Sequence, residues 1–210
     1  MEKEQLEKLN SAISEAKGKR KFLQSVDLSL NFTGIDFSKQ DNRLNMEIKL
    51  PHGKGKQSKV LVFADDRNVA SKAQEAGAKV ASGKDMQEMA NDKVKLSELL
   101  EYELLAQPSL MPQIARTLGQ FLGPRNKMPK PILGSDVGAM VGNIGKSIYI
   151  RSKGRYLPTI HCVVGNENMD VGSIASNIDE VVDTFTRKLG RQHIKSVYVK
   201  LTMGKPVRIS

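Results

Sequence analysis

Strict alternation of hydrophobic and polar residues marks four short segments, two near each end of the chain. These segments are residues 26–32, 44–50, 159–164 and 196–201. A period of two residues is typical of strands with one buried and one solvent-facing side. Apolar residues at helical spacing precede the first pair over residues 2–17 and separate the second pair around residues 174–185. The two ends of the chain therefore predict the same α+β style of structure.

The middle of the chain follows a different pattern, because residues 60–64 (VLVFA) form a continuous apolar run. Such a run is typical of a parallel strand buried on both sides. Asp65 and Asp66 then favour the start of a helix over residues 66–76, which ends at Gly77. Further predicted elements are a strand at 78–82 and helices near 83–105, 109–122 and 135–144. We therefore predict a small doubly wound α/β unit.

Two segments rich in lysine and glycine bound this middle region, PHGKGKQSK at 51–59 and RSKGRYLP at 151–158. Neither is suited to packing a core, so we interpret them as paired linkers. The predicted fold combines α/β and α+β architecture in two domains. A split α+β domain comes from both termini, residues 1–53 plus 156–210, and residues 54–155 form an inserted Rossmann-like three-layer α/β domain that is able to swing on its connections.

The charge of the chain favours a polyanionic partner. Its 210 residues include 33 Lys and Arg against 23 Asp and Glu, a formal net charge of +10. Nucleic acid is the first candidate, although such an excess also keeps proteins soluble. Divided at the predicted boundaries, the net charge is +1 for residues 1–53, +7 for 54–155 and +2 for 156–210.

The sequence predicts a cytoplasmic protein without membrane contact. Cys162 is the only cysteine, which excludes an intrachain disulfide and a thiolate zinc site and fits a reducing setting. The beginning of the chain lacks the features of a secretory signal, and no apolar run approaches the ~20 residues that cross a bilayer. Four Tyr and six Phe, with no Trp, argue against base-stacking sheets of the RRM or OB type.

No pattern in the sequence predicts a catalytic, cofactor or metal site. The segment GNIGKS resembles a phosphate loop, but Met140 stands where a glycine is required five residues before Gly145. The three histidines, His52, His161 and His193, share no metal-ligand spacing. An enzyme that uses the Rossmann-like domain stays an alternative, because a catalytic triad is assembled in space and not in sequence.

Two clusters near the ends of the chain are candidates for binding RNA. They consist of Lys19, Arg20, Lys21 and Phe22, and of Thr202, Met203 and Gly204. The first cluster places three cations and a ring between a helix and a strand, where phosphates are able to meet them together. Its alternative is a solvated helix end, whose cations suit the helix dipole. The second cluster ends a strand with a glycine that allows close backbone approach, and its alternative is an ordinary turn.

A family resemblance joins these clusters to a third feature, the stiff basic loop LGQFLGPRNKMPKP at residues 118–131. This string resembles the signature of the family of the first-numbered protein of the large ribosomal subunit. KRKFLQSVDLSL, LPHGKGK and SVYVKLTMGKPVRI are similar to other landmarks of the family and occur in its order. The resemblance covers nearly the whole chain and is closer to archaeal than to bacterial members.

The resemblance implies a non-catalytic protein of the large subunit that binds rRNA, forms the mobile stalk beside the tRNA exit site and assists release of deacylated tRNA. Its implied partners are stalk rRNA, exit-site tRNA and its own mRNA, which it would repress, and the free protein would be a monomer without a cofactor. The implied RNA-binding residues are Lys21, Phe22, Ser196, Thr202, Met203 and Gly204, with His161 adjacent, and the basic cluster adds Lys19 and Arg20. Arg125, Lys127 and Lys130 form a secondary basic loop.

The residue types at this implied site suit RNA. A threonine hydroxyl is able to donate to and accept from the 2′-hydroxyl that distinguishes RNA from DNA. Met203 would cover such bonds, Lys21 would attract phosphate, and Phe22 would either stack on RNA or anchor the strand. From the charge distribution we expect the terminal domain to supply specificity and the inserted domain to add salt-sensitive attraction. A general basic RNA binder without a preferred RNA fold stays an alternative.

Overall fold

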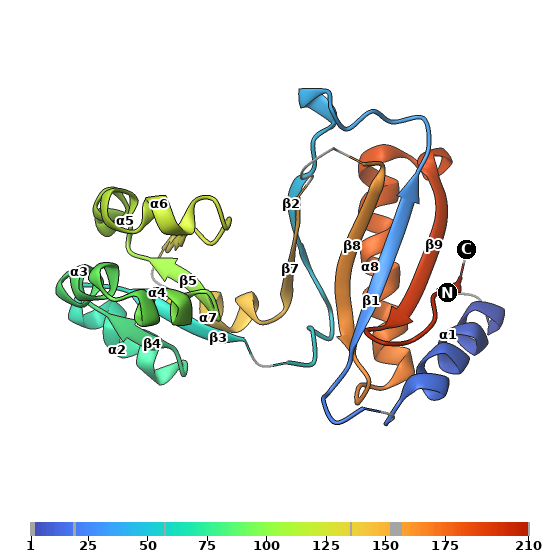
Figure 1. The fold of residues 1–210 in the computed structure, drawn as a ribbon, viewed down its shortest axis with the longest axis horizontal. Helices are drawn as coiled ribbons and strands as arrows, with labels where there is room; N and C mark the ends of the chain where they lie inside the picture. The colour runs from blue at the N-terminus through green and yellow to red at the C-terminus, as the bar shows by residue number, and fades with distance from the viewer. Residues whose placement is uncertain (1–2, 19, 57, 135, 152–156, 210) are drawn as a thin grey trace. The chain divides into compact units, whose positions relative to one another are not determined.

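The computed structural model describes residues 3–18, 20–56, 58–134, 136–151 and 157–209. The chain divides into two compact units (Figure 1). We call residues 1–56 with 146–210 the terminal unit and residues 57–145 the inserted unit. The boundaries expected from the sequence fell after residues 53 and 155, so residues 54–56 and 146–151 lie in the terminal unit and not in the insert.

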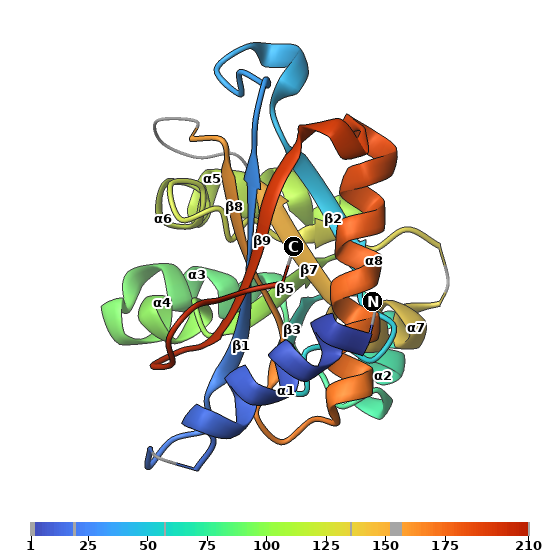
Figure 2. The same cartoon turned by 90° about the vertical axis from the view of Figure 1, so that its right-hand side faces the viewer.

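An antiparallel sheet of four strands forms the centre of the terminal unit, in the order β10-β9-β1-β8. Its strands are β10 (Val207–Arg208), β9 (Ile194–Leu201), β1 (Ser25–Phe32) and β8 (Thr159–Asn166). Every second residue of β1 is buried, as the alternation predicted, because helices α1 (Lys3–Ala16) and α8 (Val171–Leu189) pack on that side. Figure 1 shows α8 behind the long strands, and Figure 2, turned by 90°, shows it to one side of them, so α8 belongs to a second layer.

A two-stranded antiparallel ribbon completes the terminal unit and explains part of the boundary shift. It joins β2 (Asn45–Lys49) to β7 (Ser147–Arg151), with Ile48 opposite Ile148. Both isoleucines are buried in the same core as the main sheet. A short 3-10 helix (Gln40–Asn42) precedes β2, and another (Arg191–His193) leads from α8 into β9. Because β2 needs β7 as its partner, the chain that returns from the insert belongs structurally to the termini.

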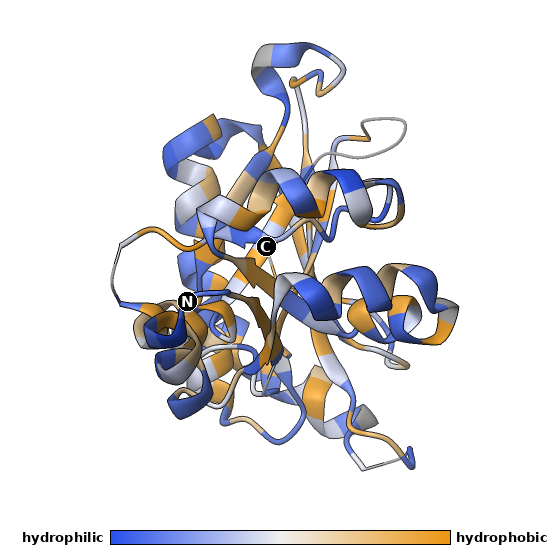
Figure 3. Ribbon diagram, turned by 90° about the vertical axis from the view of Figure 1, so that its left-hand side faces the viewer, coloured by the Kyte–Doolittle hydropathy of each residue, from blue (hydrophilic) through white to orange (hydrophobic). Residues whose placement is uncertain are grey.

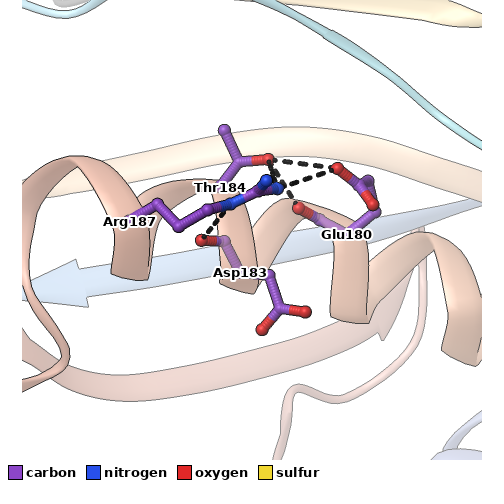
Figure 4. A network of polar contacts seen from close by, with 4 residues as sticks. All are labelled: Glu180, Asp183, Thr184 and Arg187. Atoms are coloured by element: carbon purple, nitrogen blue, oxygen red, sulfur yellow. Dashed lines mark hydrogen bonds and ion pairs between the residues drawn. The ribbon is translucent and has the colours of Figure 1, made fainter.

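On the solvent-facing side of α8, the side chain of Arg187 is paired with groups of the same helix. The Arg187 guanidinium donates to a Glu180 carboxylate oxygen at 3.2 Å and to the Thr184 hydroxyl at 3.5 Å (Figure 4). The Thr184 hydroxyl in turn donates to the Glu180 carbonyl oxygen at 2.7 Å. Exposed ion pairs of this kind contribute about 0–1 kcal/mol to stability. Arg187, a cation on this face, is therefore already paired within its own helix.

The inserted unit is a parallel sheet with helices on both sides, which confirms the predicted three-layer α/β architecture. The strand order is β4-β3-β5-β6, with β3 (Lys59–Phe63) and β5 (Tyr102–Ala106) in the centre and β4 (Lys79–Ala81) and β6 (Lys130–Pro131) outside. One core packs against α3 (Gly83–Asn91), α4 (Lys93–Leu99), α5 (Met111–Thr117) and α6 (Gly119–Leu122). The other packs against α2 (Arg67–Glu75) and α7 (Val137–Ile144). Figure 3 shows hydrophobic strands between helices that carry hydrophilic outer stretches.

Two sequence predictions in this unit need correction. Residues 102–106 form the central strand β5, although a helix was expected near 83–105. The run YELLA is short and apolar, and such a run does not distinguish a buried strand from a buried helix. The helix expected over 109–122 is divided into a 3-10 turn (Pro108–Leu110), α5 and α6. The helix start at Asp66 is confirmed, because its carboxylate accepts a hydrogen bond from the Asn68 amide.

Residues 51–56 are fixed to the terminal unit and do not act as a loose linker. The buried Asn177 side chain accepts from the His52 amide at 3.0 Å and donates to the Gly53 carbonyl oxygen at 2.8 Å. The Asn166 side-chain amide donates to the Gly55 carbonyl oxygen at 2.7 Å. Gly55 has φ +70°, and a Cβ there would lie 2.5 Å from the Asn166 side chain. The glycine is thus required by both backbone conformation and space.

The net charge lies almost entirely in the terminal unit once the structural boundaries are used. Residues 57–145 contain 11 Lys and Arg against 10 Asp and Glu, a net charge of +1. The remaining 22 Lys and Arg against 13 Asp and Glu give the terminal unit +9. The difference between this +1 and the +7 of residues 54–155 is the charge of six cations in residues 54–56 and 146–155. The expectation that the insert adds salt-sensitive attraction therefore loses its basis in charge.

Candidate functional site

The turn after β9 meets the beginning of β1, which brings together residues far apart in sequence. The Thr202 amide donates to the Ser25 carbonyl oxygen at 3.1 Å, and the Thr202 hydroxyl accepts from the Ser25 amide at 3.1 Å. The same hydroxyl lies 3.3 Å from the Ser25 carbonyl oxygen, to which it donates. A hydroxyl has one proton and two lone pairs, so one lone pair remains for a ligand. Thr202 is therefore available mainly as an acceptor, and not equally in both roles as we expected.

The tight turn at residues 202–204 exposes an apolar side chain. The Gly204 amide donates to the Leu201 carbonyl oxygen at 2.8 Å, which closes the turn. Met203 is at the tip, with 58% of its surface exposed. An exposed, flexible thioether side chain is suited to covering polar contacts with a partner. The geometry is thus compatible with the expected role of this turn.

A basic arm lies next to this turn. It consists of residues 18–24, between α1 and β1, and carries Arg20, Lys21 and Phe22, all exposed. Lys19 lies outside the described residues. About half of the Phe22 ring is open to solvent, at 51% exposure, so it is not simply a core anchor. A surface hollow between arm and turn is lined by Ala12, Glu15, Arg20, Gln24, Met203, Gly204 and Lys205. Arg20 and Lys205 therefore lie beside the exposed Met203 at one corner of the terminal unit.

A buried carboxylate and a buried amide hold this corner together, and no sequence pattern marked either of them. Glu167 and Gln24 are 7% and 1% exposed. The Glu167 carboxylate accepts from the Gln24 main-chain amide and from the Gln24 side-chain amide, both at 3.2 Å. The Gln24 side-chain oxygen then accepts from the Met203 amide at 3.2 Å. Only a contact map would find this pair, because residues 24, 167 and 203 follow no common local pattern.

The remaining predicted residues lie along the face of the sheet opposite α1 and α8. Ser29 lies opposite His161 on β8 and opposite Tyr198 on β9, while Asn31 lies opposite Ser196. At ~3.3 Å per residue, Ser196 is about 20 Å from Thr202 along β9. The predicted residues thus form a strip that begins at the corner, not one compact cluster. Ser196 is also 7% exposed and accepts from the Asn31 side chain at 3.0 Å, so its hydroxyl already has a partner.

The open face carries a carboxylate, Asp27, opposite a cation. Asp27 lies opposite Lys200 in the β1–β9 register. Burial raises the pKa of the Asp27 carboxyl, while Lys200 and His161 act in the opposite direction. On the other face of β8, burial and then the charge of Asp27 raise the pKa of the Cys162 thiol to about 12. Cys162 therefore stays protonated and has no place in the site.

The secondary basic loop uses part of its charge within the inserted unit. The Lys127 ammonium forms an ion pair with Glu103 at 3.2 Å and donates to the Tyr102 carbonyl oxygen at 3.3 Å. The Arg125 guanidinium lies over the Phe121 ring at 3.9 Å and donates to the Phe121 carbonyl oxygen at 2.9 Å. Lys130 lies in strand β6 and is half-buried. Within this loop, Lys127 is thus already paired, and Arg125 is stacked on the ring of Phe121 in the preceding helix α6.

The inserted unit offers acidic groups where a Rossmann-type domain binds phosphate. Ligands bind such sheets beyond the carboxyl ends of the strands, where the strand order reverses, here between β3 and β5. At that point the Asp65 carboxylate accepts from the Gly83 amide at 2.9 Å, and the Gln107 side chain accepts from the Asp65 amide at 3.3 Å. A carboxylate already takes an amide near the start of α3, where a phosphate would otherwise find a donor. This arrangement disfavours a nucleotide.

The described residues contain neither a metal-binding cluster nor a membrane-spanning helix. Within that part of the chain, no group of three or more His, Cys, Asp or Glu side chains is arranged to hold a metal ion. Among the same residues, no helix has the length and apolar character to cross a membrane.

Comparison with known proteins identifies the family. Residues 12–205 match the model of the Ribosomal protein L1p/L10e family. The chain is 38% identical to the large ribosomal subunit protein uL1 of Thermococcus kodakarensis, over 97% of both chains. It is 39% identical to that of Thermoplasma acidophilum, over 95% of this chain and 93% of the relative, and 38% identical to that of Methanothermobacter thermautotrophicus over the full length of both. These relatives are archaeal, as the sequence landmarks indicated, and the family is one of ribosomal proteins and not of enzymes. The chain belongs to the Ribosomal protein L1p/L10e family.

Proposed function

We propose that this protein is a structural constituent of the large ribosomal subunit that binds large-subunit rRNA through its terminal unit. Family membership supports the ribosomal role. The observation that carries the choice of surface is the corner at which the basic arm (residues 18–24) and the turn (residues 202–204) meet. There, Arg20 and Lys205 line one hollow with the exposed Met203. Lys21 and the exposed Phe22 follow Arg20 along the arm. RNA with unstacked bases and closely spaced phosphates suits such a surface.

The charge distribution supports the same choice. The terminal unit carries +9 and the inserted unit +1. Phosphate contacts supply most of the salt-dependent affinity for nucleic acid. The side of α8 that faces solvent is internally paired through Arg187 and Glu180. The RNA surface is therefore expected on the arm, the turn and the open face of the sheet, and not on α8.

The finer role that we propose is a mobile stalk beside the tRNA exit site, where the protein assists release of deacylated tRNA. The ordered family landmarks and the division of the chain into two units support it. Repression of the protein's own mRNA is part of the same proposal, since a message that imitates the rRNA site would bind the same corner. Toeprinting on that mRNA, with and without the protein, would test the repression.

A matched pair of variants tests the RNA surface. Lys21→Ala removes a cation from the arm, and Arg187→Ala removes one from the paired face of α8. Binding to a stalk-region rRNA fragment is measured between 50 and 400 mM KCl, with unrelated duplex RNA as competitor. Lys21→Ala should weaken binding and reduce the salt slope by about 1, because one phosphate contact is lost. Arg187→Ala should leave both unchanged.

The same assay separates the alternatives. Equal competition by unrelated duplex RNA would favour a general basic RNA binder. Equal effects of the two variants would refute the proposed surface. Saturable binding of ATP or NAD would favour the enzyme alternative. The Asp65 carboxylate disfavours that alternative, because it lies where such a domain would bind phosphate.

A further inference from the structure

Glu167 does not reach the proposed RNA surface, yet it contacts the basic arm directly and is linked to the turn through Gln24. Its side chain is buried at the end of β8, where the main chains of Glu167 and Gln24 continue the pairing of β8 with β1 through a 3.0 Å hydrogen bond. One carboxylate oxygen accepts from the Gln24 main-chain amide, and the other accepts from the Gln24 side-chain amide. The second oxygen also accepts from the Gly18 amide at 3.4 Å. Glu167 thus holds the basic arm at both of its ends.

The carboxylate also determines which way the Gln24 side chain faces. A side-chain amide has an oxygen that accepts and a nitrogen that donates. Because the Glu167 carboxylate only accepts, the Gln24 nitrogen must face it. The Gln24 oxygen must then face the Met203 amide, to which it is hydrogen-bonded at 3.2 Å. The chain of contacts therefore runs from Glu167 through Gln24 to the turn.

We infer that Glu167 is a positioning residue for RNA binding, which presets the arm and the turn in one arrangement by fixing the orientation of Gln24. The inference rests on the proposed function, because it assigns a role within the same site. Holding both segments before RNA arrives reduces the ordering that binding would otherwise require. Buried networks of this kind are effective only when every donor and acceptor is satisfied.

Substitution by glutamine tests the inference with little change of shape. Glu167→Gln replaces one carboxylate oxygen, which accepts hydrogen bonds, by an amino group, which donates them. The Gln24 main-chain and side-chain amides that face residue 167 also donate. One of the two Gln24 donors then loses its partner, or the Gln24 side chain turns over and presents its nitrogen to the Met203 amide. In either case the turn loses its preset position, and we expect RNA affinity to fall about tenfold, or about 1.4 kcal/mol. Most of the loss should appear as slower association, because fewer molecules are in the competent arrangement.

An exchange of the two residues provides the rescue. The double variant Gln24→Glu with Glu167→Gln places the acceptor on residue 24 and the donor on residue 167, with the same net charge. A carboxylate at position 24 still accepts from the Met203 amide, and the glutamine at 167 donates to it. Binding should recover to within about threefold of the wild type, since of the contacts described above only the long one to Gly18 remains lost. Amide hydrogen exchange at Met203 should be fast in the single variant and slow again in the exchanged pair.

The outcomes distinguish this inference from the proposed function. Lys21→Ala is the comparison variant, because it acts on the surface directly. If the wild type fails to bind stalk rRNA, the proposed function is wrong and the inference falls with it. If Lys21→Ala weakens binding while Glu167→Gln changes neither RNA affinity nor exchange at Met203, only the inference is refuted. If Glu167→Gln does not fold, the exchanged pair decides: a folded pair with restored binding supports the inference, and a folded pair with tenfold weaker binding refutes it.

Discussion

The hydroxyl of Thr202 gives the sharpest prediction about the RNA surface. Thr202→Val keeps the shape of the side chain and removes two hydrogen bonds to the Ser25 main chain, at 3.1 and 3.3 Å. Thr202 is exposed, so water is able to replace these bonds in the free protein. We therefore expect a loss of about 0.5–1.5 kcal/mol in the free energy of unfolding.

The effect on RNA binding should be larger than the effect on stability. In the complex, water is excluded, and both the Ser25 amide and the RNA hydroxyl that used the free lone pair of Thr202 would lack a partner. Leaving a buried polar group unpaired costs about 1–3 kcal/mol, which corresponds to roughly a 5- to 150-fold weaker affinity. Thr202→Ser keeps the hydroxyl and serves as the control.

Two measurements on each variant test this reasoning. Urea unfolding gives the free energy of unfolding, and filter binding to the stalk rRNA fragment gives the dissociation constant. Thr202→Ser should resemble the wild type in both. Should Thr202→Val lose stability but bind RNA with unchanged affinity, the hydroxyl is structural only, and Thr202 does not belong to the RNA surface.

Further predictions concern charge, pH and the basic loop. Deletion of residues 57–145 should leave the salt slope of RNA binding nearly unchanged. Deletion of residues 54–155 removes six more cations and should reduce the slope. Equal slopes for the two deletions would contradict the assignment of these charges to the terminal unit. Burial raises the pKa of Asp27, so the folded state holds this proton more tightly than the unfolded state, and the group's contribution to stability falls as pH rises from 3.8 through the raised pKa. Asp27→Asn should therefore gain stability over the wild type as pH rises from 3 to 6 in urea titrations, and a constant difference would count against this. With its pKa raised to about 12, Cys162 should react with iodoacetamide at pH 8 about two to three orders of magnitude more slowly in the folded than in the unfolded protein, as measured by mass spectrometry. Lys127→Ala should lower thermal stability by at most about 1 kcal/mol and leave rRNA affinity within twofold, because its charge is paired with Glu103; a tenfold loss would return the loop to the RNA surface.

Periodicity in the sequence was sufficient to predict the helices and strands that have one buried and one solvent-facing side. In β1, alternate residues from Val26 to Phe32 are buried, so the period of two was plainly visible. The helix α8 similarly repeats Ile174, Ile178, Val181 and Phe185 at helical spacing, and all four are buried. The strand β5 was missed because it is central and follows a helix without an intervening glycine or proline, so no period or break marked it. The strand β7 was missed because it depends on a partner a hundred residues away.

The candidate site likewise has parts that the sequence predicts and parts that it does not. The arm and the turn were found because each is a local string of distinctive residues. Their meeting could not be predicted from either string, since it depends on the pairing of β1 with β9. Glu167 and Gln24 were invisible because a buried carboxylate or amide is distinguished by its partners and not by its neighbours in sequence. The net charge of the insert was wrong for a related reason. Six cations near the domain boundary belong to the terminal unit, and the pairing of β2 with β7 that places part of this segment there is not visible in the local sequence.

On the proposed function, the terminal unit binds rRNA at the corner formed by the arm and the turn. The decisive experiment is ultraviolet cross-linking of purified large subunits, followed by mass spectrometry of the RNA-linked peptides. We expect adducts in residues 20–24 and 200–205 of the terminal unit. Adducts to rRNA confined to residues 57–145, or to the outer face of α8 around Arg187, would contradict it.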